Sequence, residues 1–500
     1  MKVGFLHLGR EHLGITALSA KLKSYGHQIR LYYDPGLFTS EDNVFHSVRF
    51  AKFFSRETWL LDQIMHDSPN VLALSVYTST YRWCVKMAET LRHRGFSGLI
   101  VMGGVHVTLA PESALFSSAV DYGMAGETDE AFPLFLDKLA TGKEFLDSPN
   151  LIYRDLLNNT VINPPMEPIK NLDRLPFPDK ELFADELNIT DDYLVITGRG
   201  CPYSCTYCCE SAYNRIYGHK YYRRRSTTSI LDELEEGVRR YHSKEVMFFD
   251  PVFFTDKRWL AELMEGYRRR IKLRFRCFGR FSLVDEEIIN ELIRSGCYAV
   301  EFGLQTWDER IRSNLLGRQG ANEQVRSAMD MFDRLGLHYD VDHIFGLPGE
   351  TQEHYILAAY EYSKCRMLNR IKCHYLIYFP SLPILKTAES LGEISPDTNA
   401  KIERGDIGDF FHQPMTDSMR AKINERYIRL FEILPILPKS FVRFFADRGG
   451  IKWMPKFISI LLQLLVAIKG KDYRFFVYIR YYYHRVKRHF LIAIKNKKHP

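Results

Sequence analysis

The most informative stretch of this 500-residue sequence is Arg199-Gly200-Cys201-Pro202-Tyr203-Ser204-Cys205-Thr206-Tyr207-Cys208-Cys209. It places three cysteines in a C-x3-C-x2-C spacing on a short loop, directly after the strand-like run 193–197. Thiolates bind zinc, copper(I) or iron–sulfur clusters. Structural zinc takes four ligands, usually in paired spacings, and no second pair follows here. Three ligands leave one iron of a cubane [4Fe–4S] cluster open, so the loop predicts a reactive cluster.

This loop, with Tyr207 immediately before Cys208, resembles the cluster loop of radical S-adenosylmethionine (SAM) enzymes. The resemblance implies that Cys201, Cys205 and Cys208 hold the cluster and that SAM binds the open iron. Reductive cleavage of SAM then gives a 5′-deoxyadenosyl radical. We do not expect Cys209 to be a ligand, because adjacent side chains point in different directions. The alternative is a set of buried apolar cysteines that happen to have this spacing.

Composition and charge set the broader limits. Hydrophobic residues make up 46% and charged residues 26% of the chain, as in globular proteins generally, and the length predicts two or three domains. Nine cysteines without a recognisable signal peptide favour a reducing cytosol. The net charge of +7 is concentrated in residues 451–500, which hold 12 Lys or Arg and one acid. The rest of the chain is therefore slightly negative.

Residues 1–145 alternate strand-like and helix-like segments. Strands are expected at 2–8, 28–33, 71–76 and 99–102, with helices between them, which predicts an α/β domain with a parallel, doubly wound sheet. Such sheets bind ligands beyond the carboxyl ends of their strands. The candidate binding residues at those ends are Ser75, Gly103, Gly104, Gly126 and Glu127.

The pattern Gly103-Gly104-Val105-His106, followed by Gly126-Glu127, resembles the cobalamin-binding domain fused to many radical SAM enzymes. The resemblance implies a Rossmann-like cobalamin-binding domain in which the five candidates contact the cofactor. A D-x-H-x-x-G motif would supply a cobalt ligand, but Arg10-Glu11-His12-Leu13-Gly14 stands in its place, so no axial ligand is assigned. The alternative is a domain that kept this fold and binds nothing. The proline-rich residues 146–192 are expected to form an extended linker.

Residues 193–390 repeat six strand–helix units, which predicts the partial (βα)6 barrel of a radical SAM domain. Functional residues of such barrels lie at the carboxyl ends of the strands. The resemblance implies SAM contacts there from Asp250, Glu301, Gly303, Gln305 and Gly346. Pro251 replaces a polar residue of the family, which leaves the role of Asp250 open. Taken singly, each of these residues also suits a turn or a helix cap, and no catalytic residue is assigned.

Residues 391–500 are expected to be helical. The apolar run 451–469 is interrupted by Lys456 and Gln463 and is too short for a clean membrane span. Residues 474–488 interleave aromatic side chains with arginine and lysine. This pattern suits a helical cap on the barrel, or a helix that lies on an anionic membrane surface. Nucleic acid is not an expected partner, because no nucleic-acid-binding fold is visible.

Both domains together favour cobalamin-dependent methyl transfer to an unactivated carbon of a small-molecule or lipid-like substrate. Electrons would come from a donor such as flavodoxin or ferredoxin. The alternatives are a radical cyclisation, a rearrangement or another oxidoreductase reaction with the same machinery, and a non-catalytic iron–sulfur or cobalamin sensor. We expect a cytoplasmic protein whose tail can touch the inner face of the membrane. The substrate and the oligomeric state are not indicated.

Overall fold

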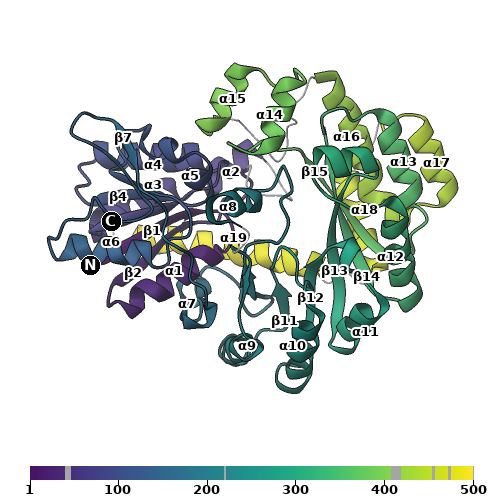
Figure 1. Cartoon of the computed structure of the whole chain (residues 1–500), viewed down its shortest axis with the longest axis horizontal. Coiled ribbons are helices and arrows are strands. Elements are labelled where there is room, and N and C mark those ends of the chain that lie inside the picture. Colours follow the sequence, from purple (N-terminus) through teal and green to yellow (C-terminus); the bar gives the residue numbers. More distant parts are fainter. Residues whose placement is uncertain (40–46, 219–220, 407–417, 453–455, 471–473, 499–500) are drawn as a thin grey trace.

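The computed structural model describes residues 1–39, 47–218, 221–406, 418–452, 456–470 and 474–498. Two sheets organise it, one in each predicted domain, and they lie in the two halves of the molecule (Figure 1). The first sheet has strand order β2-β1-β3-β4-β5-β6-β7. Its strands are β1 (Lys2–Leu8), β2 (Gln28–Asp34), β3 (Val71–Ser75), β4 (Leu99–Gly103), β5 (Tyr122–Met124), β6 (Leu151–Arg154) and β7 (Thr160–Ile162).

The first five strands are parallel, which confirms the doubly wound prediction. β1 lies between β2 and β3, and the direction of winding reverses there. A ligand crevice is expected at that point, beyond the carboxyl ends of the strands. The strands form because continuous apolar runs can be buried on both faces of a parallel sheet. The helices of this domain are α1 (Leu13–Ser24), α2 (Val48–Phe54), α3 (Glu57–Asp67), α4 (Tyr81–His93), α5 (Val105–Leu109) and α6 (Ala131–Ala140).

The region predicted as an extended linker has more structure than expected. β6 pairs antiparallel with β5, and β7 with β6, so part of residues 146–192 extends the first sheet. The short helix α7 (Glu181–Ala184) follows. Asn150 explains why the chain turns back here, because its side-chain amide donates to Ala125 O (2.6 Å) and its side-chain oxygen accepts from Met166 N (2.8 Å).

The second sheet has order β15-β14-β13-β12-β11-β8, and every pair of neighbours is parallel. This is the predicted partial (βα)6 barrel, with β8 and β15 as its edges. Its strands are β8 (Tyr193–Val195), β11 (Glu245–Phe248), β12 (Arg274–Gly279), β13 (Cys297–Gln305), β14 (His338–Phe345) and β15 (Leu368–Tyr375). Five helices cover its outside, namely α9 (Thr227–Tyr241), α10 (Lys257–Arg270), α11 (Glu286–Arg294), α12 (Asn322–Leu335) and α13 (Gln352–Tyr362).

Polar side chains at their N-termini fix where several of these helices begin. Ser226 caps α9 by accepting from Ser229 N, as the sequence suggests, and Asp256 and Asp285 cap α10 and α11 in the same way. Such caps satisfy backbone N–H groups that have no partner within the helix. The helices bury apolar faces against the outer side of the barrel sheet, where Phe281 stacks on Phe302 with ring centroids 4.1 Å apart.

The inner face of the barrel sheet is charged. Lys372 Nζ lies 2.5 Å from Glu301 Oε2, Arg276 lies 2.8 Å from Asp192, and Arg370 lies 3.4 Å from Asp340. Buried charges persist only when they are paired in this way. The inner face of the sheet is therefore lined by ion pairs.

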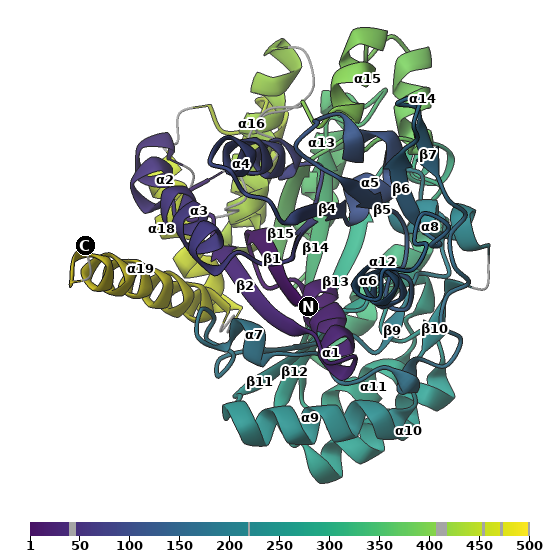
Figure 2. The same ribbon diagram turned by 90° about the vertical axis from the view of Figure 1, so that its left-hand side faces the viewer.

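The C-terminal helices are α14 (Pro383–Ser390), α15 (Pro396–Glu403), α16 (Ser418–Ile433), α17 (Lys439–Asp447), α18 (Lys456–Lys469) and α19 (Arg474–Lys498). None of the described helices combines the length and the apolar character needed to cross a bilayer. α19 runs from the barrel to the first domain (Figures 1 and 2). Arg485 is buried and donates to the Tyr33 hydroxyl (2.7 Å) and to Pro35 O (3.2 Å). Arg485 thus fixes α19 to the first domain.

Candidate cluster and cofactor site

The cysteine loop follows the two-residue strand β9 (Gly198–Arg199), which pairs with β10 (Arg223–Arg224). Gly200 opens the loop with a φ of 79°, and a Cβ there would lie 2.7 Å from the Tyr221 ring, so glycine is required. Asn214 of α8 (Glu210–Tyr217) then donates to Cys201 O (2.9 Å) and to Tyr203 O (3.1 Å). The first part of the loop is therefore held through its backbone carbonyls by the Asn214 side chain.

The three predicted ligands are free thiols; Cys201 and Cys205 are buried and Cys208 is half-buried. Burial raises the pKa of the Cys201 thiol to about 12, so a thiolate there needs a compensating positive centre. A hydrogen bond with the Cys209 side chain lowers the pKa of Cys208. Among the described residues, no three Cys, His, Asp or Glu side chains converge tightly enough for one metal ion. Each ligand of a cubane binds a different iron, so three thiols on one loop suit a cluster.

Arg318 lies beside this loop and was not among the predicted residues. Its Nη1 is 3.8 Å from Cys205 Sγ and 3.5 Å from the Tyr207 hydroxyl. A Cβ at Gly303 would lie 3.3 Å from Arg318 Nη2 and 2.3 Å from Gln305 Nε2. The structure thus brings Gly303 and Gln305 to the cluster loop. The signal in the sequence that could have pointed to Arg318 is an arginine between two glycines, in residues 317–320, after a predicted strand end.

The other predicted SAM residues are engaged in contacts of their own. Asp250 accepts from Thr197 N (3.0 Å) and from Thr197 Oγ1 (2.7 Å), and burial raises its pKa to about 6. It therefore fixes the end of β8 just before the cysteine loop. Glu301 faces the lumen, paired with Lys372. Gly346, at φ 80°, donates its backbone N–H to the Glu350 carboxylate (3.0 Å).

The predicted cobalamin residues separate into two groups. Ser75, Gly103 and Gly104 gather at the carboxyl ends of β3 and β4, where a Cβ at Gly104 would lie 2.7 Å from Val76 N and 3.3 Å from Ser75 Oγ. Ser75 Oγ also lies 2.9 Å from His12 Nε2. His12 Nδ1 accepts from a backbone N–H, so both of its ring nitrogens are engaged and it is not a free cobalt ligand.

One buried polar atom at this edge suits a ligand. His106 Nε2 is buried and has no hydrogen-bond partner among the described residues, while its Nδ1 lies 3.0 Å from Thr78 Oγ1. Burial lowers the pKa of His106 to about 4, so the ring is neutral. A neutral imidazole nitrogen and nearby hydroxyls can hydrogen-bond the polar side groups of a corrinoid. The residues at this edge therefore fit cobalamin.

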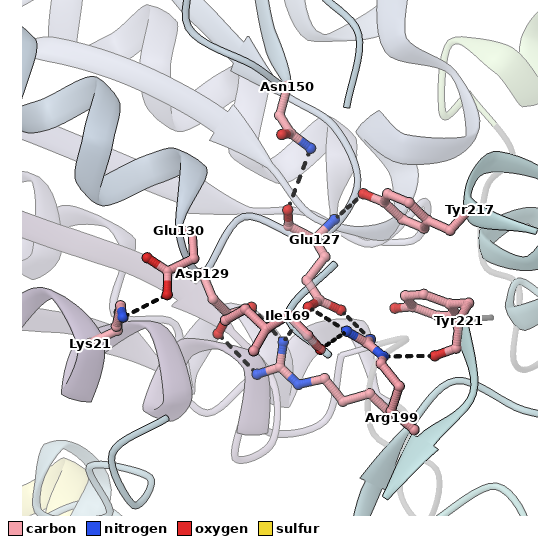
Figure 3. A network of polar contacts seen from close by, with 10 residues as sticks. Lys21, Glu127, Asp129, Glu130, Asn150, Ile169, Arg199, Tyr217 and Tyr221 are labelled. Atoms are coloured by element: carbon pink, nitrogen blue, oxygen red, sulfur yellow. Dashed lines mark hydrogen bonds and ion pairs between the residues drawn. The ribbon is translucent and has the colours of Figure 1, made fainter. Parts of the chain in front are cut away.

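Gly126 and Glu127 form the second group and face the barrel domain (Figure 3). The Glu127 carboxylate lies 2.7 Å from Arg223 Nη2, and its backbone N–H donates to the Tyr217 hydroxyl (2.7 Å). A Cβ at Gly126 would lie 2.1 Å from that hydroxyl. These two residues, predicted to contact cobalamin, are engaged in the domain interface.

Arg199 completes this interface network (Figure 3). Its guanidinium makes a two-point contact with the Asp129 carboxylate, with Nη2 to Oδ1 at 2.9 Å. Burial alone would raise the pKa of Asp129, but the charge of Arg199 holds it below its usual range. Arg199 stands two residues before Cys201. The network therefore ties the carboxyl end of the first sheet directly to the cluster loop.

The basic run 223–225 has a structural role. Arg224 donates to Phe253 O (2.6 Å) and to the Thr255 hydroxyl (2.7 Å). Arg225 pairs with Glu233 and donates to Ser229 O (3.0 Å). Together with Arg223, these contacts hold the cluster loop, the first domain and α9 together.

Two protein families match the chain in the two places that the geometry singles out. The Radical SAM superfamily matches residues 195–359, and the B12 binding domain matches residues 11–136. The chain is a radical SAM protein with an N-terminal B12-binding domain. Its cofactors are accordingly a [4Fe–4S] cluster, SAM and cobalamin.

Relatives of this radical SAM protein include an uncharacterized methyltransferase of Pyrococcus horikoshii, 26% identical over 57% of this chain and 62% of the relative. The cytidylyl-2-hydroxyethylphosphonate methyltransferase of Streptomyces wedmorensis is 21% identical over 70% of this chain and 73% of its own length. The chain spans less than two thirds of the length of the Pyrococcus horikoshii protein. A solved structure of the cobalamin-dependent radical enzyme OxsB, with aqua-cobalamin and SAM bound, has a TM-score of 0.66 at 14% identity. The matched region covers 89% of this chain and 70% of OxsB. At this identity, the likeness shows a shared fold alone.

Proposed function

We propose that this radical SAM protein is a methyltransferase that uses cobalamin to methylate an unactivated carbon of a small molecule. One observation carries the proposal. The cluster loop is tied to the ligand-binding edge of the B12 domain through Arg199 and Asp129, and through Tyr217 and Glu127. An enzyme that needs only SAM cleavage has no use for a B12 domain bound to its cluster loop.

We assign each cofactor to a separate group of residues. Cys201, Cys205 and Cys208 hold the cluster, Glu301 and Gln305 contact SAM, and Ser75 with Gly103 and Gly104 lines the cobalamin site. When bound, the cluster supplies the electron that cleaves SAM, and cobalamin supplies the methyl group. Arg318, next to Cys205, keeps a positive charge beside the cluster, where hydrogen bonds to sulfur influence the reduction potential.

The chain also has to keep water away from reactive intermediates. Leu109 of the first domain is buried among side chains of the barrel domain, including Leu376 and Tyr378. Ser381 Oγ donates to Leu109 O (2.7 Å), which closes the same seam with a hydrogen bond. A packed apolar seam of this kind suits radical chemistry, because exclusion of water from a reactive site prevents side reactions.

The names of most of the relatives support methyl transfer, and one is named a cyclase. The Pyrococcus horikoshii and Streptomyces wedmorensis proteins are both named methyltransferases. We further propose a lipid-like substrate, a small electron-transfer protein such as flavodoxin or ferredoxin as the reductant, and a peripheral membrane contact made through α19. A radical cyclisation, a rearrangement or another oxidoreductase reaction would use the same cofactors without methylating the substrate.

The test starts with anaerobic reconstitution of the protein with iron, sulfide and cobalamin. SAM and dithionite are then added, 5′-deoxyadenosine is assayed, and the corrin absorbance is recorded after desalting. We expect wild type to form 5′-deoxyadenosine and to retain the corrin. Cys205→Ala should lose SAM cleavage but keep the corrin, because its change lies outside the first domain. Cys365→Ala, on the far side of the barrel sheet, should behave as wild type.

Two outcomes would contradict the proposal. SAM cleavage without retained corrin would remove the case for methyl transfer and leave cyclisation or rearrangement. An intact cluster without any SAM cleavage would favour a sensor.

A further inference from the structure

Three helices turn apolar side chains toward solvent. On α2, Phe50 and Phe53 are 58% and 60% exposed. On α18, Leu465 and Ile468 are 51% and 58% exposed, and on α19 Tyr483 and Leu491 are 68% and 44% exposed. Single exposed apolar residues are ordinary, but a group of them on neighbouring helices marks an interaction surface.

These helices lie together on one side of the molecule, shown at the left of Figure 2. The Phe53 ring is 6.4 Å from the Phe490 ring, and Phe54 is 4.9 Å from His489, so α2 packs along α19. α18 contacts α19 as well. We call the outer surface of α2, α18 and α19 the tail face.

The tail face is strongly basic. Its three helices contain twelve Lys or Arg and no Asp or Glu, although the whole chain has 61 acids. Three of the twelve, Arg480, Arg485 and Arg488, belong to the packed side of α19 and not to the tail face. Lys52, Lys469 and Lys487 are exposed on it. Like charges that gather without acids between them repel one another in water, and that cost is relieved by an anionic partner.

The opposite side of α19 is firmly packed. Arg485 bonds Tyr33 and Pro35, Arg480 bonds Asp191 (2.9 Å), and Arg488 lies 3.3 Å from Glu186. The inner side of α19 is therefore fixed to the first domain and to the 146–192 segment. Its exposed apolar residues point outward from a helix whose buried side is already satisfied.

We propose that the tail face docks on an anionic phospholipid bilayer. Apolar side chains flanked by lysine and arginine on helices that lie in one surface are the features of interfacial binding, and basic residues near an anionic leaflet are attracted to it. A second copy of the chain would bring two basic faces together, which charge repulsion opposes. The inference specifies the peripheral contact suggested under the proposed function. It would place the enzyme where lipid-like substrates are found.

The test is co-sedimentation of the full reconstituted chain with vesicles, which needs no turnover. Loss of vesicle binding and loss of SAM cleavage are therefore separate results. Vesicles of phosphatidylcholine alone are compared with vesicles that contain about 30% phosphatidylglycerol. We expect binding only to the anionic vesicles. Tyr483→Glu and Leu465→Glu should each weaken it about fivefold or more, since each loses an apolar contact and adds a charge of the wrong sign.

Leu157→Glu is the matched control, because Leu157 is 82% exposed in the turn between β6 and β7, away from the tail face. It should bind as wild type does. The proposal fails if wild type does not bind anionic vesicles, or if Leu157→Glu weakens binding as much as Tyr483→Glu. It also fails if sedimentation velocity shows a wild-type dimer that Tyr483→Glu dissociates, because the tail face would then join two copies.

Discussion

Glu350 is a carboxyl group buried behind the end of β14. One of its oxygens accepts from Gly346 N (3.0 Å), Leu347 N (3.3 Å) and the Tyr355 hydroxyl (2.7 Å). The other oxygen is buried and has no hydrogen-bond partner in the described part of the chain. Burial raises the pKa of Glu350 to about 8, despite these hydrogen bonds. The strand end predicted to lie near SAM is therefore supported by a carboxyl group that is largely protonated at neutral pH.

This residue predicts a pH dependence of stability. Between the usual glutamate pKa and about 8, the folded state binds more protons than the unfolded chain, so the free energy of unfolding falls as pH rises. Glu350→Gln removes this dependence. From about pH 5.5 to about pH 8, wild type should lose roughly 1–3 kcal/mol more than Glu350→Gln. Urea unfolding followed by tryptophan fluorescence measures the difference.

Glu353→Gln is the control, since Glu353 is exposed, and a hydrogen bond from Thr351 lowers its pKa. It should follow the wild-type profile. Equal slopes for wild type and Glu350→Gln would show that Glu350 is ionised throughout this pH range.

At the residue scale, the sequence was most informative where chemistry dictates spacing. Gly303 and Gln305 lie beside Arg318, which contacts Cys205, so the end of β13 reaches the cluster loop. Arg318 was missed because an arginine between glycines has no distinctive pattern of its own. Its place next to Cys205 depends on how the loop after β13 folds back. The assignments of all these residues to cofactors remain predictions.

At the scale of elements, the most consequential contact joins β10 to the loop after β5. Arg223 and Glu127 form an ion pair in which both side chains are less than 10% exposed. Arg223 also donates to Ile169 O (2.6 Å) and to Tyr221 O (2.9 Å). Removing Glu127 leaves the buried Arg223 charge with carbonyl partners, and removing Arg223 leaves Glu127 with the Arg199 guanidinium at 3.5 Å. Either loss costs more than the pair itself contributes.

We therefore predict strong coupling in a double-mutant cycle. Arg223→Gln and Glu127→Gln should each lower the free energy of local opening by about 3 kcal/mol, and the double variant should recover about 2 kcal/mol of the combined loss. Hydrogen exchange of the backbone amides in β9, β10 and residues 126–130 measures this opening.

An exposed pair provides the comparison. Arg270 lies 2.7 Å from Asp232, and both side chains are at least one third exposed. The same cycle there should give a coupling below about 1 kcal/mol. If the Arg223–Glu127 cycle gave an equally small coupling, the two domains would not be held together by this network.

Elements were predictable where a repeating pattern existed. Period and turn signals located the strands of both parallel sheets and the order of their helices. β6 and β7 were missed because prolines surround them, and proline is tolerated at the sheet edge that they form. Residues 146–192 therefore read as an extended linker although part of them continues the first sheet.

At the scale of the whole molecule, the C-terminal helix is the element whose role the sequence left open. Its arginines and aromatic residues suit a barrel cap and a membrane surface equally well. The structure shows that one side of α19 packs against the first domain and the 146–192 segment, through Arg485 and Arg480. The tail face is left for a partner. The composition of α19 does not tell which of its sides is buried, because this depends on which acidic residues of other elements pack against the helix.

The central claim is that three cysteines hold a [4Fe–4S] cluster with one iron open to SAM, at the edge of the B12 domain. Electron paramagnetic resonance of the dithionite-reduced, reconstituted protein tests it most directly. The account predicts a reduced-cluster signal that changes when SAM is added, because SAM becomes a ligand of the open iron. It also predicts loss of that signal in Cys205→Ala and its persistence in Cys365→Ala. A cluster signal that SAM leaves unchanged, or one that survives in Cys205→Ala, would contradict the account.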